Sequence, residues 1–192
     1  DGDEYVLNGS KMWITSGAIA DVVNCTAKTD PDAGTRGISC FLVEQGMPGF
    51  IPGKNEPKMG LKGSVTSALS LENCRVPAES LLGKEGEGFK QMLVTLDGGR
   101  ISIGAMALGL AQAAFDESVA YMKERTAFGK KIAQYQYWQF RMAQRAIEIE
   151  NARNLFLKAA LRMDQGVEFP EPEAAGAKYY ATEIAGDMAR DA

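Results

Sequence analysis

The chain divides into two parts by where its prolines fall. Of the seven prolines in 192 residues, five lie at or before Pro77, and none lies between Ala78 and Phe169. Proline removes a backbone donor and interrupts helices and central strands, so long helices are open only to the proline-free stretch. We therefore expect two domains of different secondary structure, one over residues 1–85 and one over residues 86–192.

The first part has the pattern of short strands separated by turn residues. Asn8-Gly9 tolerates positive φ and predicts a tight turn that divides Tyr5–Thr15 into two paired strands. Further strands are expected over Val22–Ala27, Ile38–Val43, Phe50–Pro52 and Ser67–Leu71. This pattern favours an antiparallel β-sandwich or barrel.

The second part changes to the three-and-four spacing of amphipathic helices. One apolar stripe consists of Leu108, Ala111, Phe115, Val119 and Met122. A longer stripe consists of Trp138, Met142, Ala146, Ile149, Ala152, Phe156, Ala160 and Met163. A third helix is expected to begin near Pro172, with an inner face of Ala177, Tyr180, Ile184 and Met188. Such stripes form cores, so we expect an antiparallel helical bundle and an α+β fold class.

Composition argues against several functional classes. Twenty-one basic and 25 acidic residues leave a net charge of −4 without a basic cluster, which argues against a nucleic-acid groove. Unbroken apolar runs are far shorter than the roughly 20 residues that cross a bilayer, so no membrane span is expected. The absence of histidine excludes His-dependent triads and His-ligated metals within the chain. Cys25, Cys40 and Cys74 are interpreted as small buried hydrophobes of a reducing compartment, and no metal site is expected.

The ends of the chain have no processing signal. Asp1 leads directly into strand-like sequence without a methionine, and Ala192 lies within a helix-like pattern. We interpret the chain as a piece of a longer polypeptide, so the absence of a targeting segment says nothing about compartment.

Three short stretches are candidate binding sites, each with a structural alternative. Trp13 and Thr15, two apart on a strand, could form a flat wall and a donor for a planar ligand, although spacing alone favours a tryptophan packed in the β core. In Asp97–Arg100, an i,i+3 ion pair flanks two glycines that each cost about 1 kcal/mol in a helix, which indicates close approach by another helix or a ligand. Arg125–Lys131 is either an anion-binding loop or a solvated surface loop.

Four segments together resemble the acyl-CoA dehydrogenase family. They are Lys11–Gly17, Met59–Ser64, Asp97–Arg100 and Glu124–Lys130, and their order and spacing match along the whole chain. The resemblance implies the middle β domain and the first part of the C-terminal helical domain. It also implies FAD as cofactor and removal of hydrogens from the α and β carbons of an acyl-CoA thioester.

The resemblance assigns cofactor contacts to six residues. It implies that Trp13 lies against the flavin ring and that the Thr15 hydroxyl, with the nearby backbone at Ile14, hydrogen-bonds the N5 edge. A donor there stabilises the charge that arrives on reduction. Arg125 corresponds to an arginine that reaches the FAD pyrophosphate of a neighbouring subunit, with Gln136 and Phe128 beside it, which implies a homotetramer.

Substrate contacts are implied along Asp97–Arg100, where Gly98 and Gly99 would admit the thin acyl-pantetheine chain, and at Thr35. Lys62, Ser64 and Thr66 could line the same side, and turn or β-core roles explain them equally well.

No catalytic base is implied within the chain. Some branched-chain members carry a glutamate at the position of Gly99, and the majority carry it in a Tyr-Glu-Gly-Thr segment near the C-terminus. We therefore expect the base outside this chain, beyond Ala192, and expect residues 1–192 alone to be inactive.

The preferred hypothesis is a fragment of a short- or medium-chain acyl-CoA dehydrogenase of fatty acid β-oxidation. An electron-transfer flavoprotein would accept its electrons, in the bacterial cytoplasm or the mitochondrial matrix. The alternatives are an acyl-CoA oxidase or flavin monooxygenase on the same scaffold, and a non-enzymatic α+β binding or assembly module.

Overall fold

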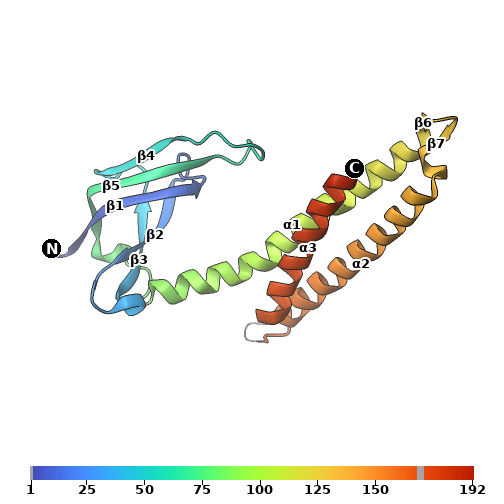
Figure 1. The fold of residues 1–192 in the computed structure, drawn as a ribbon. Helices are drawn as coiled ribbons and strands as arrows, with labels where there is room; N and C mark the ends of the chain where they lie inside the picture. Colours follow the sequence, from blue (N-terminus) through green and yellow to red (C-terminus); the bar gives the residue numbers. More distant parts are fainter. Residues whose placement is uncertain (1, 168–170) are drawn as a thin grey trace. The chain divides into compact units, whose positions relative to one another are not determined.

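The structure, a computed structural model, describes residues 2–167 and 171–192. The chain forms two compact units, Asp1–Leu93 and Val94–Ala192. The first unit contains β1 (Glu4–Thr15), β2 (Val22–Lys28), β3 (Ile38–Glu44), β4 (Phe50–Asn55) and β5 (Thr66–Pro77). The remaining helices and strands are α1 (Gly88–Glu124), the two-residue strands β6 (Thr126–Ala127) and β7 (Lys130–Lys131), α2 (Gln136–Asp164) and α3 (Glu171–Asp191) (Figure 1). The α+β class with antiparallel sheets is confirmed, and the predicted domain limits at residues 85 and 86 stay a prediction.

The first unit is built from two antiparallel sheets around one apolar core. A three-stranded sheet has the order β1-β5-β4, and β2 pairs with β3 in a second sheet. Both sheets contribute to a buried cluster of Leu7, Cys25, Phe41, Val43, Phe50, Leu69, Leu71, Cys74 and Val76. All three cysteines are free and buried, as the sequence predicts. Removal from water raises the pKa of each thiol, so they act as small hydrophobes in the neutral form.

The predicted turn at Asn8-Gly9 is wrong. β1 continues through this dipeptide, and its pairing with β5 shifts between Leu7 and Gly9. The Asn73 backbone N–H donates to Asn8 Oδ1 at 2.7 Å, and Asn8 Nδ2 donates to Asn73 Oδ1 at 3.3 Å. The conformational freedom of Asn8-Gly9, from which we predict a turn, instead allows a β-bulge within a continuous strand.

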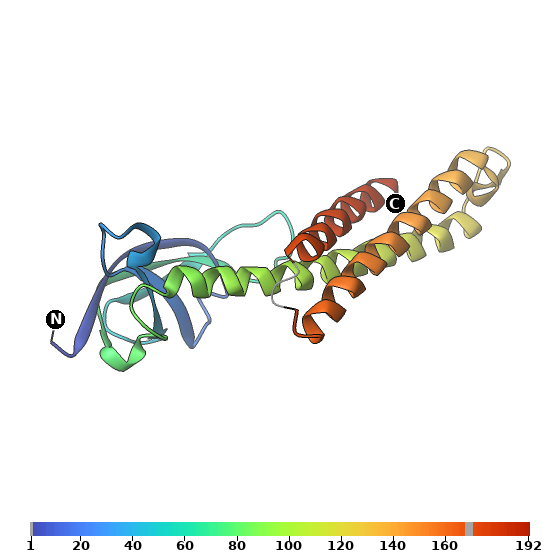
Figure 2. The same cartoon turned by 90° about the horizontal axis from the view of Figure 1, so that it is seen from below.

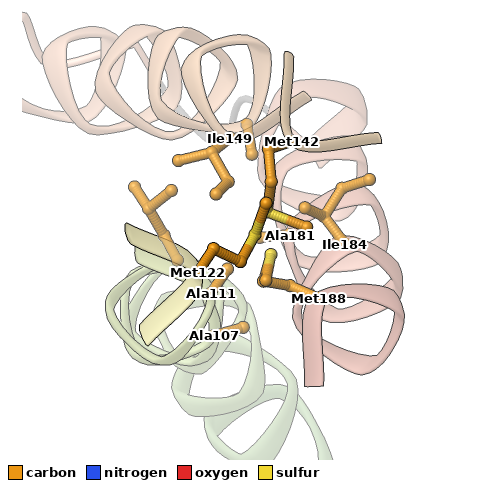
Figure 3. Close-up of a cluster of buried hydrophobic side chains, with 10 residues drawn as sticks. Ala107, Ala111, Met122, Met142, Ile149, Ala181, Ile184 and Met188 are labelled. Carbon is orange, nitrogen blue, oxygen red and sulfur yellow. The ribbon is translucent and has the colours of Figure 1, made fainter. Parts of the chain in front are cut away.

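Three helices of the second unit share one apolar core. Figures 1 and 2 show α2 and α3 beside the part of α1 that belongs to this unit. Figure 3 shows side chains from all three helices converging; the cluster consists of Ala107, Leu108, Ala111, Met122, Met142, Ile149, Ala152, Ala181, Ile184 and Met188. The predicted stripe of α1 is confirmed, with Phe115 and Val119 packed against the cluster. On the predicted face of α3, Ile184 and Met188 belong to the cluster, Tyr180 packs against it, and Ala177 is buried.

The predicted inner face of α2 is wrong at Ala146 and Met163, which are exposed. The buried residues of α2 are Met142, Arg145, Ile149, Ala152 and Ala159. Positions 145 and 146 both lie near the core-facing side of α2. Arg145 is buried in place of Ala146 because ion pairs neutralise its charge there.

Arg145 of α2 is 1% exposed and forms ion pairs that link α2 to α3. Its Nε donates to Asp191 Oδ2 at 2.6 Å, and its guanidinium also pairs with Glu148 at 2.6 Å and Asp187 at 3.0 Å. Burial works to lower the pKa of Arg145, but its hydrogen bonds to Asp191 and Glu148 outweigh that effect and raise it. Arg141 adds an ion pair to Asp191 at 2.8 Å. An apolar pattern alone cannot reveal this charged cluster.

One described helix, α1, is long and apolar enough to cross a membrane by length and composition alone. Core helices of helical domains share this property. The expectation that the chain has no membrane span therefore stays a prediction.

Candidate functional site

The end of β1 presents Trp13 on an irregular backbone. Pairing with β5 shifts between Lys11 and Ile14, and Trp13 has a φ of 55°. The period-two argument that places Trp13 and Thr15 on one face therefore does not hold through this bulge. Trp13 is 73% exposed, so the alternative of a tryptophan packed in the β core is wrong. Thr15 is also exposed.

The backbone beneath these two side chains is fixed. The Ser16 N–H donates to the Val65 carbonyl at 2.9 Å, and the Gly17 N–H donates to the Ile14 carbonyl at 3.2 Å. A Cβ on Gly17 would lie 2.8 Å from the buried Ser67 Oγ, so the turn after β1 packs closely on β5. Ile14 packs against the β core. The strand end is thus anchored while Trp13 and Thr15 remain accessible.

Thr35 is exposed in a short 3-10 helix, Gly34–Gly37, before β3. The loop is tightened by Gly37, where a Cβ would lie 1.8 Å from the Asp30 carbonyl oxygen. Lys62 and Ser64 are exposed and Thr66 is half-buried. Their accessibility is compatible with binding and with ordinary turn roles.

A small hairpin joins α1 to α2 and carries two of the predicted cofactor residues. Thr126 pairs with Lys131 and Ala127 with Lys130, so the connection is the dipeptide Phe128-Gly129. Its φ values of 53° and 83° are those of a type I′ turn, which matches the twist of paired strands. The predicted loop is therefore an ordered hairpin.

Arg125, Phe128 and Gln136 lie together at this end of the second unit. Arg125 follows α1 directly, Gln136 is the first residue of α2, and the hairpin lies between them (Figures 1 and 2). The Ile132 N–H donates to the Arg125 carbonyl at 2.9 Å and closes the base of the hairpin. Phe128 is 98% exposed, and Arg125 and Gln136 are exposed too. Among residues 2–167 and 171–192, Arg125 has no ion pair, so its charge is available to an anion.

The predicted ion pair in Asp97–Arg100 is present in α1. Arg100 Nη1 lies 3.2 Å from Asp97 Oδ1, and both side chains are partly exposed. A Cβ on Gly98 or Gly99 would meet nothing in the described chain within 4 Å. In the same helix, a Cβ on Gly104 would lie 3.4 Å from the Ala177 backbone of α3. Gly104 is therefore a helix-packing glycine, whereas Gly98 and Gly99 leave space against the backbone.

The structure brings some of the predicted residues together but not others. Arg125, Phe128 and Gln136 lie at the same end of the second unit, whereas Arg100 precedes Arg125 by 25 residues, about 37 Å along α1. Trp13–Thr15 and Thr35 belong to the first unit, while Asp97–Arg100, Arg125, Phe128 and Gln136 belong to the second. Within the part of the chain that the structure describes, no group of three or more His, Cys, Asp or Glu residues is placed to hold a metal ion.

Sequence reasoning missed Tyr135. Its hydroxyl donates to the Ala127 carbonyl at 2.7 Å, which ties the hairpin to the residue before α2. Its only sequence signal is a tyrosine between two predicted cofactor contacts, which is too weak to assign a role.

Comparison with known proteins identifies the family. The model of the acyl-CoA dehydrogenase middle domain matches residues 1–74, and that of the acyl-CoA dehydrogenase C-terminal domain matches residues 86–192. The chain belongs to the acyl-CoA dehydrogenase family, as its four sequence segments predict.

Individual relatives agree with this assignment. The chain is 46% identical to the short-chain specific acyl-CoA dehydrogenase of Clostridium acetobutylicum over 98% of its own length. It is similar to butyryl-CoA dehydrogenase from Megasphaera elsdenii, with 44% identity, a TM-score of 0.96, and coverage of 100% of this chain and 50% of that one. A chain from the structural study of the electron transferring flavoprotein of Acidaminococcus fermentans has 49% identity, a TM-score of 0.96 and the same coverage. The chain spans about half the length of the curated relatives that it matches.

Proposed function

We propose that the chain is part of an FAD-dependent acyl-CoA dehydrogenase that introduces an α,β double bond into a short acyl-CoA thioester. Family membership supports the reaction class. The similarity to enzymes described as short-chain specific and butyryl-CoA dehydrogenases supports the substrate size. A non-enzymatic module is a weaker proposal, because both matched domains are named for the enzyme family.

The observation that carries the proposal is the exposed guanidinium of Arg125 beside an ordered hairpin, with no ion pair to any residue that the structure describes. Guanidinium is permanently charged and can donate two parallel hydrogen bonds to phosphate oxygens, so it suits the FAD pyrophosphate. Phe128 and Gln136 offer an apolar face and an amide at the same place. These residues fit a dinucleotide. Because the resemblance assigns them to the cofactor of a neighbouring subunit, we propose a homotetramer.

The first unit supplies contacts of a different kind. The accessible indole of Trp13 suits a planar ring, and the anchored strand end holds it in place. The Thr15 hydroxyl and the Ile14 backbone are proposed to hydrogen-bond the N5 edge. When bound, FAD supplies the acceptor for the hydride that leaves the β carbon. Trp13 would shield that edge from water, and Thr15 would stabilise the charge that develops there.

The second unit also supplies the proposed acyl-CoA contacts. The open space over Gly98 and Gly99 would let a narrow pantetheine chain lie against α1. The ion pair between Asp97 and Arg100 holds two polar groups beside that space. We propose Thr35, in the first unit, as a further contact to CoA.

The proton from the α carbon needs a base that these residues do not offer. Asp97 is paired with Arg100, and Gly99 has no side chain. We propose that a glutamate outside residues 1–192 abstracts it. We also propose an electron-transfer flavoprotein as acceptor and a location in the bacterial cytoplasm or mitochondrial matrix.

Replacing Arg125 tests the cofactor site directly. In the complete protein, Arg125→Gln is expected to weaken FAD binding by about ten- to a hundredfold, because hydrogen bonds to charged groups contribute about 1.5–3 kcal/mol. Arg125→Lys keeps the positive charge but loses the two parallel N–H donors of the guanidinium. Its FAD affinity should lie between those of the wild type and Arg125→Gln. Equilibrium titration of the apoprotein with FAD measures this.

Lys123→Gln is the matched control, because it removes one positive charge from an exposed residue in the last turn of α1. It should leave the FAD affinity near that of the wild type. Equal affinity of Arg125→Gln and wild type would contradict the proposed site. Rapid oxygen consumption without an added acceptor would favour the oxidase alternative.

A further inference from the structure

Tyr135 occupies the position between the hairpin and α2. It is half-buried and is the last residue before Gln136. Its hydroxyl lies 2.7 Å from the Ala127 carbonyl oxygen and 3.4 Å from that of Phe128. One side chain therefore links the start of a helix to the outer end of the hairpin.

The ring of Tyr135 makes a second link. Lys130 Nζ lies 4.2 Å from the ring centroid, within the range of a cation–π contact. The same ammonium donates to the Gln134 carbonyl at 3.4 Å. Both strands of the hairpin are thus held by the segment that precedes α2, β6 through Ala127 and β7 through Lys130.

The turn needs such support because its own conformation is costly. Phe128 has a φ of 53°, in the left-handed region that bulky residues rarely adopt. Its side chain is 98% exposed, so burial of its ring does not offset that cost. The contacts that hold the turn include the short ladder, with Thr126 opposite Lys131, and both the hydroxyl and the ring of Tyr135.

We propose that Tyr135 is a positioning residue for the cofactor, which rests on the function proposed above. Its hydroxyl holds the hairpin against the first turn of α2, so that Arg125, Phe128 and Gln136 meet the same ligand as one rigid group. A site that is ordered before binding does not spend binding free energy on ordering itself.

Tyr135→Phe tests this proposal, because it removes the hydroxyl and keeps the ring over which Lys130 lies. In the complete protein, we expect FAD affinity to fall about threefold to tenfold, the effect of one or two net hydrogen bonds. Amide exchange in the apoprotein should become faster at residues 128–131. With FAD at saturation, kcat for butyryl-CoA should match the wild type, because Tyr135 does not contact the reacting atoms.

Tyr179→Phe is the control, since Tyr179 is an exposed tyrosine on α3 that is 68% accessible. It should change neither FAD affinity nor exchange in the hairpin. Unchanged FAD affinity or unchanged hairpin exchange in Tyr135→Phe would overturn the inference. A lowered kcat at saturating FAD would also overturn it, because it would place Tyr135 at the chemistry.

These outcomes separate the inference from the function on which it rests. If Tyr135→Phe weakens FAD binding but butyryl-CoA reduces no flavin in the wild type, Tyr135 positions FAD and the proposed reaction is wrong. If butyryl-CoA reduces the flavin and Tyr135→Phe behaves as the wild type, the reaction stands and the inference is wrong. A complete wild-type protein that binds no FAD would overturn both.

Discussion

Two exposed aromatic residues, Trp13 and Phe128, adopt left-handed backbone conformations with φ values of 55° and 53°. Such conformations cost roughly 1–3 kcal/mol for a bulky residue and are typical of ligand-binding sites. With exposed fractions of 73% and 98%, neither side chain recovers that cost by burial in the chain. A ligand that stacks on the rings would supply the missing contacts, as the FAD proposal requires.

Gly49, in the loop before β4, combines a left-handed φ of 84° with a close backbone approach. A Cβ there would lie 2.3 Å from the Glu72 carbonyl oxygen. Gly46 in the same loop has a φ of 89° but open space around a Cβ. Gly46→Ala should lower the free energy of unfolding by about 1–2 kcal/mol, the cost of the φ angle alone. Gly49→Ala should lower it by about 1–3 kcal/mol more, because overpacking is added.

Chemical denaturation of both variants beside the wild type measures the two losses of stability. Equal losses would show that the approach of Gly49 to Glu72 carries no energetic weight, contrary to this prediction.

At the scale of elements, the docking of α3 on α2 depends on the ionised form of Asp191. Burial works to raise the pKa of Asp191, but hydrogen bonds from Arg145 and Arg141 outweigh this and lower it. A carboxylate whose folded pKa lies below its unfolded value of about 3.9 stabilises the fold above that pH. This contribution is lost as the pH falls through the folded pKa.

Asp191→Asn should therefore be less stable than the wild type near neutral pH, by about 1.5–3 kcal/mol for lost charge-assisted hydrogen bonds. The difference should shrink as the pH falls below about 4. Urea denaturation at a series of pH values measures it, with Asp164→Asn, at the exposed end of α2, as control. A deficit that stays constant down to the lowest pH would contradict the assignment.

How far the sequence predicts these elements depends on whether the deciding forces are local. The stripe from Leu108 to Met122 is enough to predict this part of α1, because one face of the helix packs into the core from Ala107 to Met122. The burial of Arg145 depends on Asp187 and Asp191 of α3, which are more than 40 positions away in the sequence. A local sequence pattern therefore cannot predict it. The predicted turn at Asn8-Gly9 is wrong for the same reason. Asn8 hydrogen-bonds to Asn73 on β5, which is distant in the sequence, and the strand forms a bulge there.

The candidate site divides in a similar way. The i,i+3 spacing of Asp97 and Arg100 is sufficient to predict their ion pair. The cofactor roles of Trp13 and Arg125 come from the family resemblance. Spacing alone favours a place in the β core for Trp13 and a solvated surface loop for Arg125. Nothing in the sequence predicts the φ of Trp13 or the hydroxyl contact of Tyr135, because both depend on strand register and loop closure.

At the scale of the whole molecule, the two units carry complementary chemistry. The first presents an indole and a hydroxyl suited to a flavin ring, and the second presents a guanidinium suited to a diphosphate. Both belong to a chain that matches two domains of the acyl-CoA dehydrogenase family. The central claim of our proposal is that each flavin, which takes hydride from an acyl-CoA thioester, is contacted by Trp13 and Thr15 of one subunit and by Arg125 of a neighbouring subunit.

Anaerobic titration of the complete, FAD-loaded protein with butyryl-CoA tests this claim most directly, with the visible absorbance of the flavin as readout. The claim predicts that the yellow colour bleaches as butyryl-CoA is added, and that residues 1–192 alone, given FAD, do not bleach. A complete protein whose bound flavin stays oxidised at saturating butyryl-CoA, or residues 1–192 that reduce it unaided, would contradict it.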